Sequence, residues 1–565
     1  MNIIEYIITS FDPCLHRIEM RLTFAPTSSR SVIGLPNWIP GSYKIRDFAK
    51  NVITVSATAD GKEVACVALD KHRWVIHADA KKIVVTYAVY AKDISVRMAY
   101  LDDQLFFFNA SSLCMYVEGQ EQSTCTLTIS PSKHKSCKEW HCDTALDAKK
   151  KDAKGFGTYI ADDYDALIDH PFLMGPLQTI SFKAHGIPHR MSLVGASRVD
   201  LPRLTHDLKK ICEAQISFFG KSPVKKAYVF LTWVMVHGYG GLEHRSSTAL
   251  MTSRDSLPFE GMPKEYAPYA DFLSLCSHEY FHTWHVKRTK PEAFMPYDLS
   301  EENYTRQLWI FEGFTSYYED LFLRRAGLIT QEQYLTMFAQ KITQVERNPG
   351  HLVQSVSDSS HSAWTKFYDP NENSPNVTVS YYAKGALIAW GLDVMLRRGE
   401  KHTLDDVVRF LWNTYGATGT GVPEGTVEQI ILDWGGKKLA NALDAWVNGV
   451  EPLPLIAWAK ASGWALTYVS DHPECAVDLG VRLSGDGKNT VAVCLDGSPA
   501  QLAGISAGDE IIACEGVAIR QQPLTEILRR YKVSDTVKLH VFRQEMLHEY
   551  SVVLQAGKLL KAKLE

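Results

Sequence analysis

The sequence predicts an α+β protein of several domains, and three observations support this. With 565 residues the chain is longer than a domain with a single hydrophobic core usually is. Its first 170 residues contain short alternating strands, its middle carries helical signals, and a further set of strands begins beyond Pro452 and Pro454. We therefore expect an N-terminal antiparallel β domain of sandwich-like form at 1–170, a second domain with a helical region at 171–455, and a C-terminal module at 456–565.

The strands of the N-terminal domain are expected where apolar and polar residues alternate between turn-forming residues, near 18–25, 51–59, 81–91 and 123–130. A longer apolar run at 225–236 is about half the ~20 residues that span a bilayer, so we interpret it as a buried strand. In the C-terminal module we expect strands near 488–495, 510–514, 536–543 and 547–554, and a short helix near 523–531.

Helical signals follow after about residue 268. One helix is expected from Asp271, or an earlier residue, through 286, because neither Pro nor Gly interrupts this stretch. A second is expected to begin after Ser300 as its N-cap and to end at Gly327. Further helices are expected near 331–346, 382–398 and 403–415, the last capped by Thr403.

Composition argues against several classes of partner. Sixty Lys and Arg against 64 Asp and Glu give a net charge of −4, which lacks the basic footprint of a nucleic-acid-binding protein. The eleven cysteines are scattered and include no Cys-x-x-Cys pair, as expected for reduced thiols. A signal peptide has a basic start followed by a continuous apolar core, whereas the N-terminal segment here carries the acidic residues Glu5 and Asp12. We expect a cytoplasmic protein that binds neither nucleic acid nor membrane.

His278-Glu279-Tyr280-Phe281-His282 forms an HExxH motif within the first of these helices. Residues four apart project from nearly the same helical face, so both imidazoles can reach one metal ion. Glu279 lies beside them, where it can take a proton from the attacking water. This spacing is typical of zinc hydrolases. The alternative is an amphipathic helix with two surface histidines.

Catalytic zinc usually has three protein ligands and one open position, so a third ligand is required. Glu312 lies among bulky apolar residues, where burying an unpaired carboxylate would cost several kcal/mol and a nearby cation would explain it. The alternative is a partly exposed carboxylate on a helix surface. Glu319, close to the same face, is either a solvated charge or a group behind the ligands. His285, on the face of His278, is either a neighbour of the metal or a further ligand.

Three segments, HEYFHTWHVKR (278–288), WIFEGFTSYYEDLFLRR (309–325) and LPNWIPGSYKIRDFAKNV (35–52), resemble the glycyl aminopeptidase family of zinc peptidases, relatives of the aminopeptidase N group. The resemblance extends over nearly the whole chain and implies a thermolysin-like catalytic domain within 171–455. It also implies one Zn²⁺ per chain, held by His278, His282 and the Glu of a W-x-x-E-G-F-x-S-Y motif, here Glu312. The family often has Asn where this chain has His285.

The same resemblance implies an oxyanion donor. Tyr381-Tyr382-Ala383-Lys384-Gly385 is similar to the family's Y-x-K-G motif, and matching the Lys-Gly pair selects Tyr382. A fixed hydroxyl donor aimed at developing negative charge can be worth ~3 kcal/mol. Without the resemblance, Tyr382 could equally be a packing aromatic residue.

It further implies a substrate-binding segment. Gly240-Gly241-Leu242-Glu243-His244 corresponds to the G-x-M-E-N segment of aminopeptidase N relatives, whose Glu binds the free α-amine of the substrate. Only the first Gly and the Glu match strictly. Gly240 and Gly241 would suit an edge that pairs with an extended peptide, because glycine allows close backbone approach. The alternative is a Gly-rich turn with an exposed acid.

The C-terminal module resembles bacterial PDZ domains, which bind extended peptides by strand addition. The similarity rests on four short segments in order, at 478–481, 497–500, 503–504 and 508–511. It implies a PDZ-like domain at 456–565 with a possible peptide ligand; a packing or oligomerisation role is the alternative.

Together these features predict a zinc metallo-aminopeptidase that hydrolyses the N-terminal peptide bond of peptides. Glu279 would be the general base, Tyr382 would bind the oxyanion, and Glu243 would bind the α-amine. The family resemblance implies small first residues, Gly or Ala. The alternatives are a zinc endopeptidase with PDZ-assisted substrate delivery, or a PDZ-centred binding scaffold with an idle zinc site. An ester or epoxide hydrolase is more distant.

Overall fold

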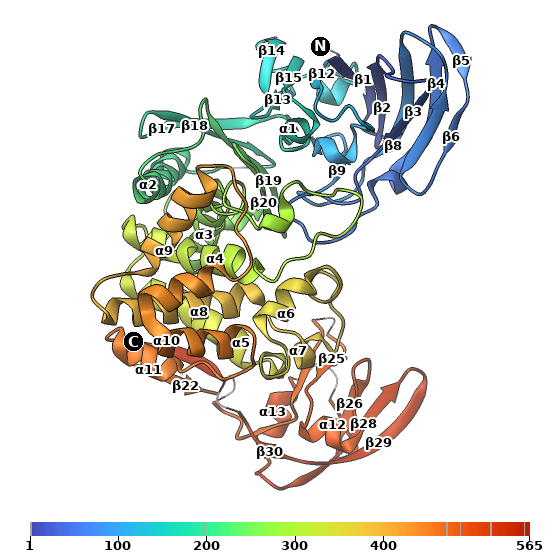
Figure 1. Cartoon of the computed structure of the whole chain (residues 1–565). Coiled ribbons are helices and arrows are strands. Elements are labelled where there is room, and N and C mark those ends of the chain that lie inside the picture. Colours follow the sequence, from blue (N-terminus) through green and yellow to red (C-terminus); the bar gives the residue numbers. More distant parts are fainter. Residues whose placement is uncertain (1–2, 197, 471–472, 486, 520–522, 559) are drawn as a thin grey trace. The chain divides into compact units, whose positions relative to one another are not determined.

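The computed structural model describes residues 3–196, 198–470, 473–485, 487–519, 523–558 and 560–565 (Figure 1). The chain forms two compact units. The first comprises Met1–Asn303, Leu321–Ile329 and Leu411–Val422, and the second comprises Tyr304–Asp320, Thr330–Phe410 and Pro423–Glu565. The expected domain boundaries at 170/171 and 455/456 stay predictions. Among the described residues, no helix is both long and apolar enough to cross a membrane.

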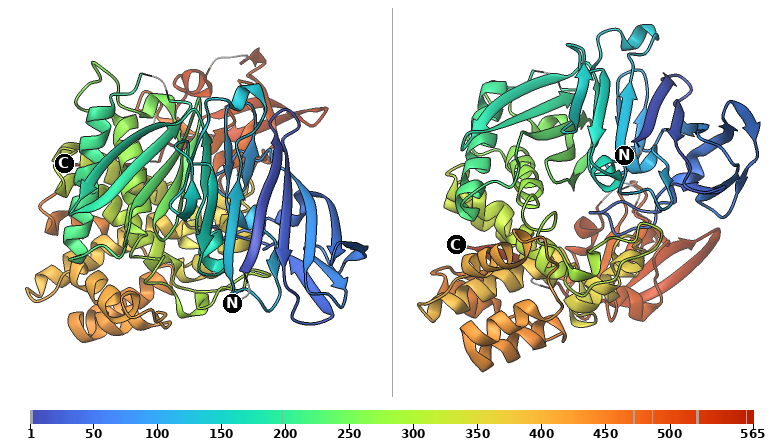
Figure 2. Two further views of the ribbon diagram at one scale, coloured as in Figure 1. Left: turned by 90° about the horizontal axis from the view of Figure 1, so that it is seen from above. Right: turned by 45° about the horizontal axis from the view of Figure 1, so that its top comes forward.

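The first unit begins with an eight-stranded sheet in the order β14-β15-β12-β1-β2-β8-β4-β5, coloured blue to cyan in Figure 2. The four expected strands are confirmed as β2, β4, β8 and β12. Most neighbours pair antiparallel as expected, but β1 and β12 pair in parallel. The strands are β1 (Ile3–Asp12), β2 (Arg17–Phe24), β4 (Val52–Ala59), β5 (Lys62–Val64), β8 (Ile83–Tyr90), β12 (Thr124–Ile129), β14 (Asp147–Lys151) and β15 (Gly157–Ala161).

Two four-stranded sheets complete this β region and share its hydrophobic core. One has the order β11-β3-β7-β6, with β3 (Arg30–Gly34), β6 (Cys66–Ala68), β7 (Arg73–His77) and β11 (Tyr116–Val117). The other has the order β13-β16-β10-β9, with β9 (Ala99–Leu101), β10 (Phe106–Phe108), β13 (His141–Asp143) and β16 (Phe172–Gly175). The short helix α1 (Tyr164–Ile168) precedes β16.

A five-stranded sheet in the order β17-β18-β19-β21-β20 follows in the same unit. The apolar run near 225–236 forms β19, which is buried almost throughout because it lies between two parallel neighbours. The helices α2 (Leu201–Phe219) and α3 (Ala267–Phe281) pack on this sheet (Figure 1). Its strands are β17 (Gln178–Ala184), β18 (Ile187–Val194), β19 (Tyr228–Met235), β20 (Tyr239–Glu243) and β21 (Ser247–Ser253).

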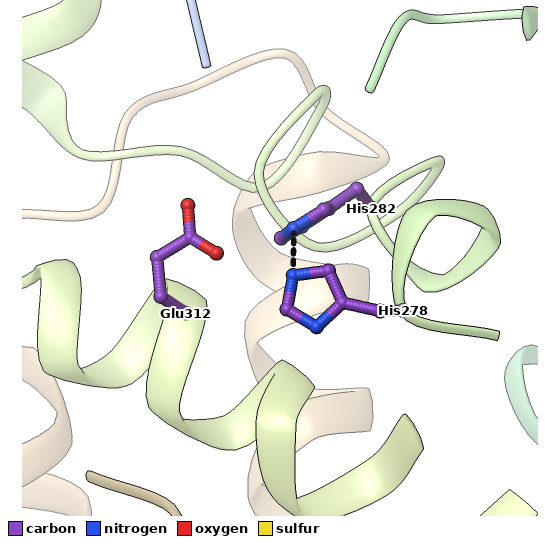
Figure 3. A group of neighbouring side chains, drawn as sticks. All are labelled: His278, His282 and Glu312. Atoms are coloured by element: carbon purple, nitrogen blue, oxygen red, sulfur yellow. Dashed lines mark hydrogen bonds between the residues drawn. The ribbon is translucent and has the colours of Figure 1, made fainter. Parts of the chain in front are cut away.

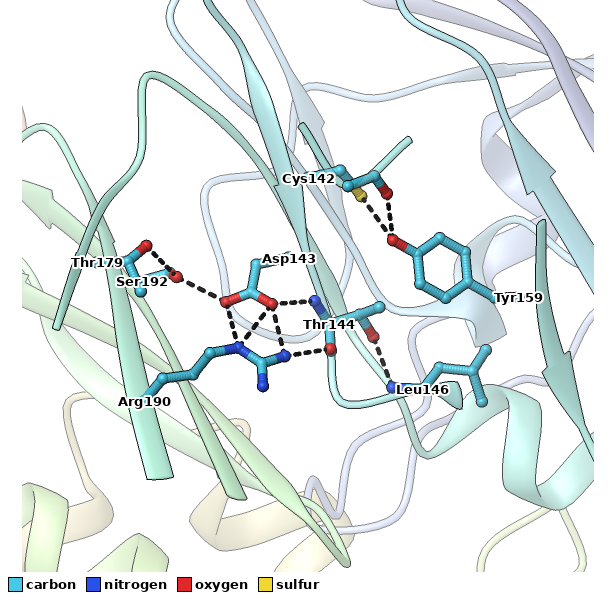
Figure 4. Close-up of polar contacts among 9 residues, drawn as sticks. Cys142, Asp143, Thr144, Leu146, Tyr159, Thr179, Arg190 and Ser192 are labelled. Carbon is cyan, nitrogen blue, oxygen red and sulfur yellow. Dashed lines mark hydrogen bonds and ion pairs between the residues drawn. The ribbon is translucent and has the colours of Figure 1, made fainter. Parts of the chain in front are cut away.

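An ion pair joins this sheet to the preceding β region. Arg190 on β18 donates to both carboxylate oxygens of Asp143 on β13, at 2.7 to 3.0 Å (Figure 4). Ser192 donates to the same carboxylate at 2.6 Å, and Arg190 also donates to the Thr144 carbonyl at 2.7 Å. The network therefore connects β18 to β13.

Helices dominate the second unit up to residue 461. Two of them begin with a capping box. Thr330 and Gln333 form one before α5, and Thr403 and Asp406 form the other before α9. The helices, including α4, whose last residues belong to the first unit, are α4 (Leu308–Arg325), α5 (Gln331–Glu346), α6 (Val356–His361), α7 (Ser374–Val377), α8 (Tyr381–Arg398), α9 (Leu404–Leu411), α10 (Thr426–Val447) and α11 (Leu455–Ala461).

The rest of the second unit is mostly β structure with a hydrophobic core of its own, formed between Cys475 and Leu554. The four expected strands and the expected short helix are confirmed as β25, β26, β28, β29 and α13. The elements are β22 (Leu466–Val469), β23 (Val477–Asp478), β24 (Val481–Leu483), β25 (Val491–Cys494), α12 (Pro499–Ala503), β26 (Glu510–Cys514), β27 (Val517–Ala518), α13 (Leu524–Leu528), β28 (Thr536–Arg543), β29 (Met546–Val553), β30 (Gln555–Ala556) and β31 (Lys561–Leu564).

Two expected helix boundaries are wrong. α3 ends at Phe281, about a turn early, and Val286 then takes a φ of 123°, which a β-branched residue rarely adopts. α4 begins at Leu308, so Ser300 does not cap it. Ser300 instead donates its backbone N–H to Asp298 at 2.8 Å within a turn, and its carbonyl accepts from Asn37 at 2.7 Å.

Candidate active site

The HExxH histidines and Glu312 lie together. The ligand atoms of His278, His282 and Glu312 are all within 4.8 Å of one another (Figure 3). The two Nε2 atoms are 3.0 Å apart, close to the separation of about 3.3 Å that two ligands of one tetrahedral Zn²⁺ would have. Two imidazoles and one carboxylate are the donor set of many catalytic zinc sites, so these side chains fit the metal expected from the sequence.

The early end of α3 orients His282. Its Nδ1 lies 2.7 Å from the carbonyl oxygen of His285, which can only accept a hydrogen bond. Nδ1 therefore carries the proton and Nε2 keeps its lone pair toward His278 and Glu312. His285 contributes through its backbone, whereas its ring packs on Phe281 with the ring centroids 5.7 Å apart. His285 is not one of the three clustered ligand residues.

Glu312 is buried, with 2% of its surface exposed, so it is not the surface carboxylate of the alternative interpretation. α4 and α8 approach so closely beside it that neither Gly313 nor Gly385 has room for a side chain. A Cβ on Gly313 would lie 2.6 Å from the Gly385 Cα. The two glycines of the E-G and K-G motifs thus bring Glu312 and Tyr382 to the same helix crossing.

Tyr382 is held at this crossing by aromatic neighbours. Its ring stacks on Tyr381 and on Phe367, and its hydroxyl lies 3.0 Å from that of Tyr368. Burial, and then the negative charge of Glu312, raise the pKa of Tyr382 well above its usual value. The hydroxyl stays protonated at neutral pH and can donate a hydrogen bond.

Gly240 and Gly241 lie in β20, the edge strand of the five-stranded sheet, rather than in a turn. The Glu279 carboxylate occupies the space where Gly241 would carry a side chain, because a Cβ there would lie 2.6 Å from Glu279 Cγ and closer still to the carboxylate. Arg97 donates to the Gly241 carbonyl at 3.2 Å. The lack of a side chain at Gly241 therefore allows α3 to lie directly against this face of β20.

Glu243 ends the same strand and is buried, with 4% exposed, so the alternative of an exposed acid in a turn is wrong. Side chains two residues apart share a strand face at a spacing of about 7 Å, so Glu243 points to the same side as the Gly241 position that Glu279 fills. Its carboxylate lies against Gly41, where a Cβ would be 2.6 Å from Oε2. Gly41 has a φ of 91°, which favours glycine, and belongs to the N-terminal PGSY segment.

Two features of the site were not indicated by sequence patterns. Gly41 lies about 200 residues from Glu243, and the segment around it is anchored by Trp38, whose Nε1 donates to the Asp298 carbonyl at 2.7 Å. Glu319 forms an ion pair of 2.7 Å with Lys341, and no pattern in the sequence indicated this pairing.

Comparisons with known proteins identify the family of this chain. A model of the Peptidase M61 N-terminal domain matches residues 5–176, and a model named M61 glycyl aminopeptidase matches residues 271–388. The crystal structure of an aminopeptidase N family protein from Idiomarina loihiensis is 39% identical, with 100% of this chain and 98% of that chain covered and a TM-score of 0.96. The chain belongs to the M61 glycyl aminopeptidase family.

Two more distant solved structures are also similar to this M61 chain, at low sequence identity. An M1 zinc metallopeptidase from Deinococcus radiodurans is 13% identical, with 80% of this chain and 94% of that chain covered and a TM-score of 0.49. A mutant of that metallopeptidase bound to a Tyr-Ser-Ala substrate is 14% identical, with the same coverage and TM-score. No curated protein matches the chain. The resemblance noted in the sequence is thus confirmed, and the fold is that of a peptidase family with a His-His-Glu cluster.

Proposed function

We propose that this chain is a zinc aminopeptidase that removes small first residues, Gly or Ala, from peptides. The observation that carries the proposal is the convergence of His278, His282 and Glu312, whose ligand atoms lie within 4.8 Å of one another. These residues would hold one Zn²⁺ per chain, with an open position for substrate or solvent. When bound, zinc supplies Lewis-acid polarisation of the carbonyl and acidifies water.

The chain's own groups would divide the remaining work. Glu279, beside the ligand histidines and against the face of β20 at Gly241, would take the proton of the attacking water and pass it to the leaving amine. Tyr382, kept protonated beside Glu312, would donate its hydroxyl to the oxygen that gains negative charge. β20 would pair with the extended substrate through its edge.

Glu243 would make the enzyme an exopeptidase. Its buried carboxylate would pair with the α-ammonium of the first residue, and its spacing of about 7 Å from the Gly241 position would admit one residue before the scissile bond. The preference for small first residues, Gly or Ala, is proposed from the family resemblance.

A panel of aminoacyl amides tests this function. Zinc-loaded protein should hydrolyse Gly and Ala amides, chelated protein should not, and N-acetylation should abolish turnover. Glu279→Gln should keep the metal and lose at least ~10³ in rate. Equal hydrolysis of free and acetylated substrates would instead support the endopeptidase alternative, and unchanged turnover by Glu279→Gln would exclude this mechanism.

We further propose that the C-terminal module is a PDZ-like domain that binds an extended peptide. The supporting observation is a groove of about 560 Å³ between the β23–β24 segment and α13, lined among others by Leu479, Val481 and Leu524. Fluorescence anisotropy with labelled peptides of free or amidated C-terminus would measure this binding. Absence of binding to either at millimolar concentration would favour a packing role.

A further inference from the structure

Asp169 is a buried acid that lies beside two segments, one that follows Glu243 and one that follows the HExxH motif. Asp169 comes directly after α1 and is 7% exposed. Its Oδ1 lies 2.8 Å from Nζ of Lys287, which is itself buried. Its Oδ2 accepts the backbone N–H of Arg245 at 3.0 Å. The same carboxylate therefore contacts two segments that are separated by about 40 residues in the sequence.

Both segments belong to the active-site motifs. Lys287 lies five residues after the zinc-ligand candidate His282, in the HVKR sequence, and Arg245 lies two residues after Glu243, in the LEHR sequence. His244, directly after Glu243, lies 3.4 Å from Asp169 through its Nδ1. Asp169 thus connects the end of the amine-binding strand to the chain that leaves the metal-binding helix.

Arg288 makes a second connection between the same segments. One of its guanidinium nitrogens, Nη1, donates to the Arg245 carbonyl at 3.0 Å and to the Thr283 carbonyl at 2.7 Å. Thr283 directly follows His282, so this side chain spans from the metal-ligand segment to the Glu243 strand. Two independent contacts therefore hold the same spacing.

The charges make this junction rigid. Burial alone would raise the pKa of Asp169, but Lys287 and then Arg245 outweigh it and hold the pKa well below its usual value. The carboxylate is therefore ionised at neutral pH. Moving the Lys287 segment away from Asp169 would leave two buried charges without their partners, which is strongly unfavourable.

We propose that Asp169, Lys287 and Arg288 are positioning residues that fix the distance between Glu243 and the metal ligands, and so confine cleavage to the first peptide bond. The inference rests on the proposed function, in which Glu243 binds the α-amine. Neither Asp169 nor Lys287 touches substrate in this scheme. They act by holding β20 and the end of α3 at a fixed distance from each other. A shift of about 1 Å in the position of a substrate-binding group typically costs about 100-fold in rate.

The test compares two charge-balanced double variants. Asp169→Asn/Lys287→Met removes the buried pair as a unit, so no buried charge is left alone. Asp143→Asn/Arg190→Met removes the pair of Figure 4, which also joins two parts of the first unit but contacts neither motif. Arg288→Gln provides a third protein that keeps the buried pair. Zinc content and circular dichroism establish that each variant is folded and loaded.

The readout is the ratio of kcat/KM on a free-amine alanyl peptide to that on its N-acetyl form, together with the residues released. We expect the ratio to fall at least 10-fold in the Asp169/Lys287 variant and in Arg288→Gln, mainly through a higher KM for the free-amine peptide, with dipeptide release appearing. The control should stay within 2-fold of the wild type. The inference is overturned if Arg288→Gln, folded and zinc-loaded, keeps the wild-type ratio and releases single residues only.

Failure of the proposed function would look different. A wild-type enzyme that cleaves free and acetylated peptides equally would remove the amine-binding role of Glu243, and with it this inference. A wild type that prefers the free amine, combined with variants that keep the same preference, would overturn the positioning role alone.

Discussion

Replacing Gly241 by alanine is a small change that should strongly affect catalysis. The new Cβ would lie 2.6 Å from Glu279 Cγ, and carbon atoms in contact are normally about 3.5–4.0 Å apart, so the Glu279 side chain must move by about 1 Å. Gly241 lies in a paired strand and Glu279 in a helix packed on it, so neither backbone yields readily. Displacing a general base by this amount should lower kcat about 100-fold.

The assay is hydrolysis of alanyl amide by zinc-loaded protein, with kcat and KM determined separately. We expect zinc content to stay near that of the wild type, because no metal ligand is touched. Gly485→Ala is the control, since a Cβ there meets nothing within 4 Å. A Gly241→Ala enzyme with wild-type kcat would refute the placement of Glu279 as the base at this strand edge.

Three further predictions concern the ligands, the oxyanion donor and acid stability. Glu312→Gln should lower zinc affinity at least ~100-fold in competition with a chelator, whereas Glu319→Gln should leave it unchanged; equal affinities would contradict the ligand assignment. Tyr382→Phe should lower kcat about 10²–10³-fold with zinc content and KM retained, and a loss confined to KM would exclude an oxyanion role. Burial lowers the pKa of both His189 and His244 to about 4 in the folded chain. As the pH falls below about 6.5, these histidines therefore become protonated in the unfolded chain while they are still neutral in the folded chain. The free energy of unfolding should therefore drop by about 2 kcal/mol per histidine between pH 6.5 and 5, and a urea midpoint that stays constant over this range would contradict it.

Local patterns in the sequence were enough to select the three residues whose ligand atoms cluster, whereas Tyr382 and Glu243 were selected by the family resemblance. The HExxH spacing places two imidazoles on one helical face, and Glu312 stood out as an acid among Trp309, Ile310 and Phe311. Both inferences depend on residues close together in the chain. The continuous apolar run of β19 and the helical pattern of α5 were predicted for the same reason.

Two helix ends and the long-range contacts could not be predicted. α3 stops at Phe281 because the chain turns to bring the His285 carbonyl to His282, a requirement of the site rather than of helix propensity. Ser300 forms a turn with Asp298 instead of capping a helix. The packing of Gly41 on Glu243 joins positions far apart in the sequence, and no local pattern records it.

Crystals of the zinc-loaded protein, measured at the zinc absorption edge, would test the central assignment most directly. We expect one anomalous peak per chain, about 2.0–2.1 Å from Nε2 of His278 and of His282 and about 2.0–2.2 Å from a carboxylate oxygen of Glu312. A peak bound elsewhere, or one that Glu312 does not reach, would contradict it.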